Sequence, residues 1–194
     1  VLRDVSDRSL SVDVADTRLP APVVLAPVGV QSIWHEAGEL ATAAGAHDAG
    51  VPLCLSTVAS TAMEPVAERL DEGVGWFQLY WVDDRSVVGS LLDRAEAAGY
   101  EAVVLTVDTP MMGWRTRIIE SEYDAFAESG GPANLATDPV LRERLADPGG
   151  DGDVLARITD LLGDPGLTWE DLDWLVDRTD LPVLVKGVRT AADA

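Results

Sequence analysis

The residues best suited to chemistry in this sequence follow directly after an apolar run. Residues 102–105 are continuously apolar, as a strand buried on both faces requires, and Thr106 and Asp108 come next. Pro110 then removes a backbone donor and prevents further strand pairing. Arg115, seven residues after Asp108, carries a planar guanidinium that can bind a carboxylate through two bonds. A hydroxyl, a carboxylate and a cation in this order predict an enzyme site rather than a capped turn beside a surface charge.

Polar side chains stand at the ends of further apolar runs. They are Ser56 after 52–55, Gln78 with Tyr80 within 75–81, and Lys186 after 182–185, and the run 22–28 has Pro27 and Gly29 at its carboxyl end. In a barrel of parallel strands the carboxyl ends meet at one face, so these groups are expected to converge. Lys186 is the only lysine beside 13 arginines, and its place after a strand favours a functional role over a solvated surface charge.

Composition excludes some classes of partner. The chain has 34 acidic and 14 basic residues, which give a net charge of −20, spread along the whole sequence. Such a field repels nucleic acid and anionic membranes, so neither is expected as a partner. No apolar stretch approaches membrane-spanning length, and no signal-peptide pattern opens the chain. We expect a cytoplasmic enzyme adapted to high salt.

Cysteine and histidine usage predicts no metal site. Cys54 is the only cysteine and lies inside an apolar run, which is typical of a small core residue rather than a nucleophile. His35 and His47 are the only histidines, and both fall in the first helical region, away from the strand ends. A structural role is therefore expected for both.

Strand and helix patterns alternate along the chain. An entry hairpin is expected near 10–14 and helices at 35–49 and 84–98. Capping boxes formed by Thr61 with Glu64 and by Thr168 with Asp171 predict two more helix starts, and another helix is expected from Thr190. Residues 110–167 form a long connection with two short helices near 138–146 and 153–162, and connections of this length are usually functional or mobile.

This alternation predicts an α/β fold with a parallel sheet and right-handed crossovers. The polar groups at the strand ends favour a (β/α)8 barrel over a doubly wound sheet, since no Gly-x-Gly-x-x-Gly turn follows any strand. A barrel needs eight strands and roughly 250 residues. With about five βα units, residues 1–194 are expected to form one partial barrel domain.

Several motifs carry a specific resemblance. They are LAPVGVQ at 25–31, LSTVAST at 55–61, FQLYW at 77–81, RAEAAGY at 94–100, LTVDTPMMGWR at 105–115, LTWEDLDWL at 167–175 and LPVLVKGV at 181–188. With these motifs the chain resembles the FMN-dependent α-hydroxy-acid oxidase and dehydrogenase family, which includes glycolate oxidase, lactate oxidase and lactate 2-monooxygenase. The triplet at 113–115 and DPVLRERL at 138–145 are most similar to the lactate 2-monooxygenase branch.

The resemblance implies FMN as the cofactor and assigns its binding residues. These are Pro27, Val28 and Gly29 beneath the isoalloxazine ring, Ser56, Gln78 and Thr106 along its polar edge, and Lys186 near N1 and the C2 carbonyl. Lys186 would stabilise the anionic reduced flavin. Tyr80 and Arg115 would bind a small anionic 2-hydroxy acid, and Asp108 would pair with a catalytic histidine and stabilise it as an imidazolium. The complete protein would be a homo-oligomer, tetrameric as in the family.

Parts of the family pattern fall outside these 194 residues. The base histidine and a second carboxylate-binding arginine follow the sixth strand of the family's barrel, and barrel phosphate sites commonly follow strands 7 and 8. After Arg115 the chain reads Thr-Arg-Ile-Ile, where the family often has an aspartate. Residues 1–194 alone are therefore expected to be aggregation-prone, colourless and inactive.

Two alternatives to a flavin-dependent oxidase of a lactate-like acid stay open. One is a non-catalytic remnant that binds a partner through an open sheet edge. The other is a barrel aldolase that uses Lys186 to form a Schiff base.

Overall fold

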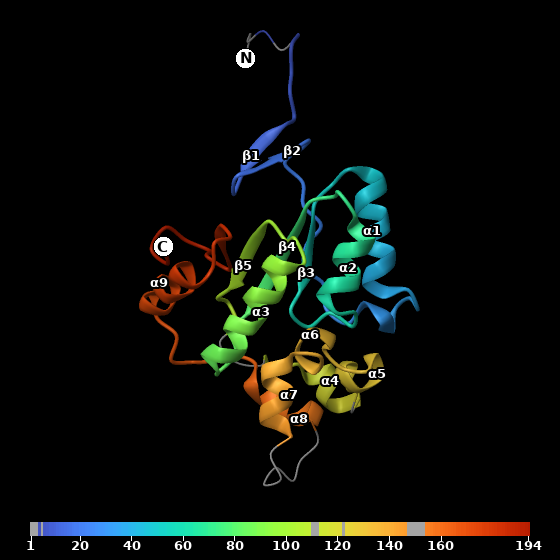
Figure 1. The fold of residues 1–194 in the computed structure, drawn as a ribbon, viewed down its shortest axis with the longest axis vertical. Helices are drawn as coiled ribbons and strands as arrows, with labels where there is room; N and C mark the ends of the chain where they lie inside the picture. Colours follow the sequence, from blue (N-terminus) through green and yellow to red (C-terminus); the bar gives the residue numbers. More distant parts are fainter. Residues whose placement is uncertain (1–3, 5, 110–112, 122, 147–153) are drawn as a thin grey trace.

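The computed structural model describes residues 4, 6–109, 113–121, 123–146 and 154–194. Its centre is a parallel sheet of four strands in the order β3 (Leu53–Ser56), β4 (Gly75–Tyr80), β5 (Ala102–Thr106) and β6 (Val183–Lys186) (Figure 1). These are four of the five buried strands expected from the sequence. Pro110, expected to end the strand pairing, lies outside the described residues.

The prediction of a fifth strand at 22–28 is wrong. Only Leu25 bridges Leu53, in the parallel direction, with the Leu25 amide donating to Pro52 and the Cys54 amide donating to Leu25. Pro22 and Pro27 have no amide hydrogen, so this segment cannot extend a regular ladder. The segment nevertheless occupies the position beside β3 that a neighbouring strand would take.

The two faces of the sheet are covered differently. On one face Leu55, Phe77, Leu79 and Leu105 belong to the main core, which also contains residues of the surrounding helices. On the other face Cys54, Trp76 and Ala102 pack with Leu19 of the hairpin β1 (Val12–Val14) and β2 (Thr17–Leu19), the expected entry hairpin. Because side chains alternate along a strand, Ser56, Gln78 and Thr106 lie on this second face.

Four helices of the βα units bury side chains in the main core: α1 (Gly38–Ala49), α2 (Met63–Leu70), α3 (Arg85–Ala97) and α9 (Trp169–Arg178). A short 3₁₀ helix, η1 (Gln31–Ile33), precedes α1, so the α-helix begins at Gly38 and not at 35 as expected. It ends as expected before Gly50, whose φ of 63° is the left-handed conformation that closes many helices.

Of the two expected capping boxes, one is present. Thr168 and Asp171 cap each other's backbone at the start of α9. The Thr61–Glu64 box is wrong, because the cap residue of α2 makes no side-chain bond and Glu64 instead accepts a 2.8 Å bond from Arg94. The helix expected from Thr190 is also wrong, since residues 191–193 form only a turn.

The described residues of the long connection between β5 and α9 hold five short helices. They are α4 (Thr116–Ser121), α5 (Ala125–Ser129), α6 (Ala133–Ala136), α7 (Pro139–Leu145) and α8 (Val154–Leu161). The last two match the expected helices, and the first three were not foreseen. Figure 1 shows this group at one end of the molecule, with the β1–β2 hairpin at the opposite end. We refer to the described residues of 113–167 as the connection.

Candidate functional site

A row of three buried side chains crosses the carboxyl ends of β3, β4 and β5. The Ser56 hydroxyl donates to Gln78 Oε1 at 3.2 Å, and Gln78 Nε2 donates to Thr106 Oγ1 at 3.0 Å. Ser56 and Gln78 face each other in the parallel register, and all three residues are at most 4% exposed. The sheet register therefore brings together three of the predicted cofactor-binding residues, which we call the amide row.

The amide row has a defined polarity. Gln78 Oε1 also accepts a 3.3 Å bond from the Thr57 amide, so its oxygen faces β3 and its NH2 faces β5. Thr106 acts as an acceptor toward Gln78, which leaves the Thr106 hydroxyl hydrogen to donate to another group. The row thus offers the second Nε2 hydrogen of Gln78 and the hydroxyl hydrogen of Thr106 as donors at the edge of the sheet.

Lys186 and Asp108 supply opposite charges next to this row. Lys186 faces Thr106 in the register of β5 and β6, and its Nζ lies 3.7 Å from Asp108 Oδ1. Both side chains are about two-fifths exposed. A Cβ atom at Gly187, whose φ is +114°, would lie 2.8 Å from the Cβ of Asp108. Glycine at 187 therefore permits the close approach that places Asp108 beside the end of β6.

Tyr80 is the last residue of β4 and lies opposite Thr106. Its pKa is raised, first by burial of the half-buried ring and then by the negative charge of Asp108, while the charge of Arg115 acts in the opposite direction. The phenol therefore remains a hydrogen-bond donor at neutral pH. Asp108 and Arg115, both predicted from the sequence, thus each lie close enough to Tyr80 for their charges to act on its phenol.

Arg115 differs from the predicted site residues on the strands because it lies in the connection. It is exposed and comes just before α4, and its carbonyl accepts bonds from the amides of Ile118 and Ile119 at 3.0 Å each. The helix start fixes its backbone, and the guanidinium is left in solvent.

The predicted segment of Pro27, Val28 and Gly29 lies against the loop after β3. A Cβ atom on Gly29 would lie 2.6 Å from Cγ2 of Val58, and the Val30 amide donates to the Val58 carbonyl at 3.0 Å. Contact with Val58 thus gives Gly29 a packing reason to be glycine. The sequence interpretation had attributed this small residue to a flavin ring alone.

Two buried residues support the amide row and were missed in the sequence. Thr57 Oγ1 donates to the Gln78 carbonyl at 2.6 Å and accepts from the Tyr80 amide at 2.9 Å. Asn134, in α6, donates to the carbonyls of Ser56 and Thr57 at 3.1 and 3.3 Å. Its Oδ1 accepts from the Met63 amide at 2.7 Å, so it caps α2 in place of the expected Thr61. Thr57 directly follows Ser56, and Asn134 is the only asparagine in the chain, but neither fact predicts these contacts.

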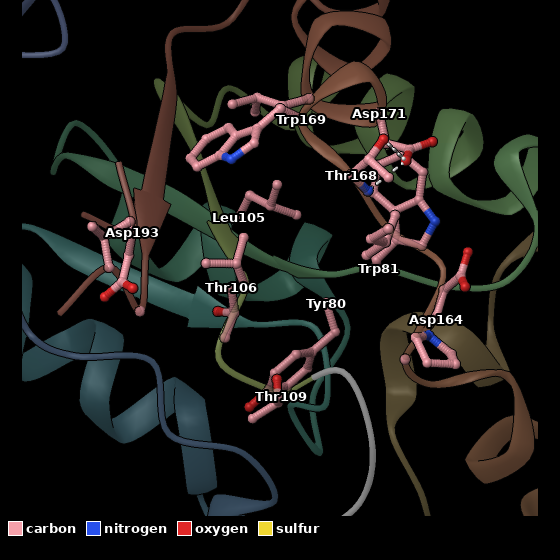
Figure 2. A pocket seen from close by; sticks show the side chains of 17 residues that line it. Tyr80, Trp81, Leu105, Thr106, Thr109, Asp164, Thr168, Trp169, Asp171 and Asp193 are labelled. Atoms are coloured by element: carbon pink, nitrogen blue, oxygen red, sulfur yellow. Dashed lines mark hydrogen bonds between the residues drawn. The ribbon is translucent and has the colours of Figure 1, made fainter. Parts of the chain in front are cut away.

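A cavity of about 450 Å³ opens beside the carboxyl ends of β5 and β6 (Figure 2). Tyr80, Thr106 and Thr109 contribute polar atoms to its wall, whereas Leu105 and Trp169 contribute apolar surface. Leu105 belongs to the helix-covered face of the sheet, so the cavity continues from the end of the amide row toward α9. It gives room for a small molecule next to Tyr80.

Cys54 lies on the same face of β3 as Ser56, two residues earlier. Burial raises the pKa of its thiol to about 12, although the positive charge of Lys186 acts in the opposite direction. A thiol with this pKa is not a nucleophile at neutral pH, as expected from the apolar run around it.

The histidines are both engaged away from the strand ends. His47 Nδ1 lies 3.0 Å from the Leu70 carbonyl, and His35 Nδ1 accepts from the Ala37 amide at 3.1 Å. In the described ranges, no group of three or more His, Cys, Asp or Glu residues could hold a metal ion. Among the helices that the structure describes, none is long and apolar enough to cross a membrane.

Comparisons with known proteins point to one family. A family model described as FMN-dependent dehydrogenase matches residues 1–194. The chain is 37% identical over 193 residues to L-lactate oxidase of Lysinibacillus sphaericus, covering 100% of this chain and 50% of that one. It is 39% identical over 194 residues to glycolate oxidase 3 of Arabidopsis thaliana, covering 100% and 51%. The chain thus spans about half the length of the curated relatives that it matches.

The solved structures agree with these matches. A crystal structure of mandelate oxidase with (S)-4-hydroxymandelic acid is similar with a TM-score of 0.80 and 36% identity, covering 100% of this chain and 52% of that one. This similarity and the family match confirm the expected α/β fold as part of a (β/α)8 barrel. The doubly wound alternative is excluded.

Proposed function

The chain belongs to the FMN-dependent dehydrogenase family, as its motifs predicted, and on that premise we propose that its protein oxidises a small L-2-hydroxy acid with FMN. The product is the 2-oxo acid or its oxidative decarboxylation product. The observation that carries the proposal is the amide row with the cation of Lys186 on the adjacent strand.

The donor set at the strand ends fits FMN. The pyrimidine edge of a flavin carries carbonyl acceptors, and the amide row offers hydroxyl and amide hydrogens that can be donated to them. Lys186 supplies the positive charge that stabilises negative charge at N1 and C2 of a reduced flavin. The backbone of Pro27, Val28 and Gly29 would lie beneath the ring. When bound, FMN supplies the hydride acceptor of the reaction.

Tyr80 and Arg115 are the residues that we propose bind the substrate carboxylate and hydroxyl. The raised pKa of Tyr80 keeps its phenol a donor, and the exposed guanidinium of Arg115 can form charge-assisted bonds to a carboxylate. Asp108 would hold a catalytic histidine as its imidazolium. Among the described residues, the ion pair recorded for Asp108 is with Lys186, and that pair keeps the carboxylate at the strand end.

The finer features of the proposal rest on sequence motifs. A lactate-like substrate and the lactate 2-monooxygenase outcome rest on residues 113–115 and 138–145. A homo-oligomer, a cytoplasmic location and adaptation to high salt are also proposed. The inactivity of residues 1–194 in isolation stays a prediction.

The aldolase alternative is less well supported. A Schiff-base lysine is activated in an apolar pocket or beside another cation. Lys186 is instead partly exposed and lies beside the Asp108 carboxylate. A non-catalytic remnant, the other alternative, gives no reason for a buried amide row next to a solitary lysine.

The decisive experiment is anaerobic reduction of the full-length protein. We expect it to purify with flavin absorbance that bleaches when L-lactate, glycolate or mandelate is added, and the fastest of the three identifies the substrate class. A colourless protein that cannot be loaded with FMN would contradict the proposal. Borohydride trapping of a carbonyl substrate on Lys186 would support the aldolase instead.

A further inference from the structure

Thr57 occupies the position at which β3 leaves the sheet while β4 continues. β3 pairs with β4 up to Ser56, opposite Gln78, whereas β4 extends to Tyr80. In a parallel ladder, the carbonyl of one residue and the amide of the residue two places later bond to the same neighbouring strand. The Gln78 carbonyl and the Tyr80 amide therefore need partners on the side from which β3 has departed.

The hydroxyl of Thr57 satisfies both groups. It donates to the Gln78 carbonyl at 2.6 Å and accepts from the Tyr80 amide at 2.9 Å. One side-chain oxygen thus replaces the amide and the carbonyl that a continuing strand would have offered. The residue is fully buried, so water does not compete for these bonds.

Thr57 is itself fixed from two directions. Its amide donates to Gln78 Oε1 at 3.3 Å, and its carbonyl accepts from Asn134 Nδ2 at 3.3 Å. These contacts hold the backbone of Thr57, and the two bonds to β4 hold its hydroxyl. The side chain therefore acts as a rigid bridge rather than a rotating group.

We propose that Thr57 is a positioning residue whose hydroxyl sets the placement of Gln78 relative to Tyr80. This inference rests on the proposed function, in which Gln78 binds the flavin edge and Tyr80 binds the substrate. Both side chains project from the same face of β4, two residues apart, and the backbone between them is pinned by Thr57 alone among the side chains described there. The hydroxyl thus couples the cofactor to the substrate without touching either.

The test replaces Thr57 in the full-length holoenzyme. Thr57→Val keeps the side-chain shape and removes the hydroxyl, whereas Thr57→Ser keeps the hydroxyl. Thr17→Val is the matched control, because Thr17 is also buried and its hydroxyl donates to Glu101 at 2.9 Å beneath the other end of the sheet. For each variant the melting temperature, the FMN dissociation constant, the visible flavin spectrum, kcat and KM are measured.

For Thr57→Val we expect kcat/KM to fall about tenfold to a hundredfold, with a higher KM and a shifted flavin spectrum, since small misplacements of reacting groups have effects of this size. Thr57→Ser should recover kcat/KM to within about threefold of wild type. Thr17→Val should lower the melting temperature with wild-type kinetics and spectrum.

The inference is overturned if Thr57→Val behaves like Thr17→Val, losing stability while its kinetics and spectrum stay at wild-type values. If Thr57→Val gives no folded protein, Thr57→Cys, with its weak S–H donor, replaces it and the same outcomes decide. Failure of the proposed function looks different, because wild type itself would then bind no flavin or reduce none.

Discussion

The carboxyl edge of the sheet and the connection hold their residues in place by different means. At the sheet edge, register decides which side chains meet, and buried hydrogen bonds then fix Ser56, Gln78 and Thr106 in one row. In the connection, the helices are four to eight residues long, and two of them begin at a local aspartate cap, Asp124 or Asp138. Short helices of this kind depend on packing and caps rather than on their own stability.

The connection is attached to the barrel segment by apolar packing and by polar contacts. Leu135, Leu141 and Ile158 are buried in the main core. Arg94 of α3 donates to the Asn134 carbonyl at 2.7 Å and to the buried Asp138 at 3.3 Å, and Asn134 reaches the end of β3. Near the start of the connection, by contrast, Trp114 is 84% exposed. The part of the connection that carries Arg115 is therefore held less firmly than the part that carries Asn134.

This difference has a consequence for function. The side chains that we propose hold the cofactor edge, Ser56, Gln78, Thr106 and Lys186, lie on strands, where register places them. A group that must meet and release substrate, as we propose for Arg115, lies on the loosely attached end of the connection. Four predictions test this division, in order of expected effect.

Lys186→Met should have the largest effect. Loss of one preorganised charge at a strand end typically costs ~3 kcal/mol of barrier, about a hundredfold in rate. We expect stopped-flow flavin reduction in the full-length enzyme to slow by about this factor with little change in substrate binding. Arg144→Met, which removes a cation of the connection paired with Asp84, should leave the rate unchanged. A Lys186 variant within a few-fold of wild type would mean that the role assigned to this residue is wrong.

Asn134→Leu tests how much one buried residue contributes to joining the connection to the sheet edge. The change leaves the buried Met63 amide without its partner and removes the donor to the Thr57 carbonyl, which should cost about 2 kcal/mol of unfolding free energy. Urea denaturation measures this, and FMN affinity should fall as well. Ser121→Ala, which removes only a bond within α4, is the control. Equal stabilities of the two variants would show that Asn134 contributes nothing to this attachment.

Glu39→Gln tests whether the buried carboxylate of Glu39 fixes the loops that carry Gln31 and Ser60. Burial would raise the pKa of Glu39, but bonds from the Ser60 hydroxyl and amide and from the Gln31 amide outweigh it and hold the pKa below its ordinary value. A lowered folded pKa gives stability that is present above the unfolded pKa of 4.5 and is lost as pH falls through the folded value.

Glu39→Gln should therefore lower the unfolding free energy by about 1.5 kcal/mol at pH 7, with the deficit shrinking toward pH 3. Urea titrations of both proteins between pH 3 and 7 measure it. A deficit that stays constant across this range would show that the Glu39 charge contributes nothing.

Salt should have the smallest effect and act on both regions. With a net charge of −20, self-repulsion is screened at about 1 M salt, where the Debye length is roughly 3 Å. We expect the melting temperature to rise by about 3 °C between low and molar KCl, roughly 1 kcal/mol. A flat profile would remove the proposed adaptation to high salt.

The sequence predicted what depends on local pattern and register. Four strands, the Thr168–Asp171 capping box and the convergence of Ser56, Gln78 and Thr106 follow from apolar runs that end in polar residues. Parallel strands joined by helices leave little freedom in where such residues end up.

Predictions from the sequence were wrong where a residue far away in the sequence makes the contact expected of a nearby one. Thr61 and Glu64 have the right spacing for a cap, but Asn134 takes the helix end and Arg94 takes the carboxylate. Residues 22–28 have the composition of a strand, but their prolines limit pairing to one bridge at Leu25. The role of Thr57 could not be predicted from the sequence, because it depends on where β3 ends relative to β4.

The thiol of Cys54 can report when β3 separates from its neighbouring strands. The described chain contains a single thiol, buried in β3 two residues before the amide row, with its pKa raised to about 12. A thiol-specific dye can therefore react at neutral pH only when β3 separates from its neighbours, so the labelling rate counts these openings directly. Because the thiol lies beneath the proposed cofactor site, a ligand that binds there should slow the labelling in proportion to its occupancy, with no engineered probe.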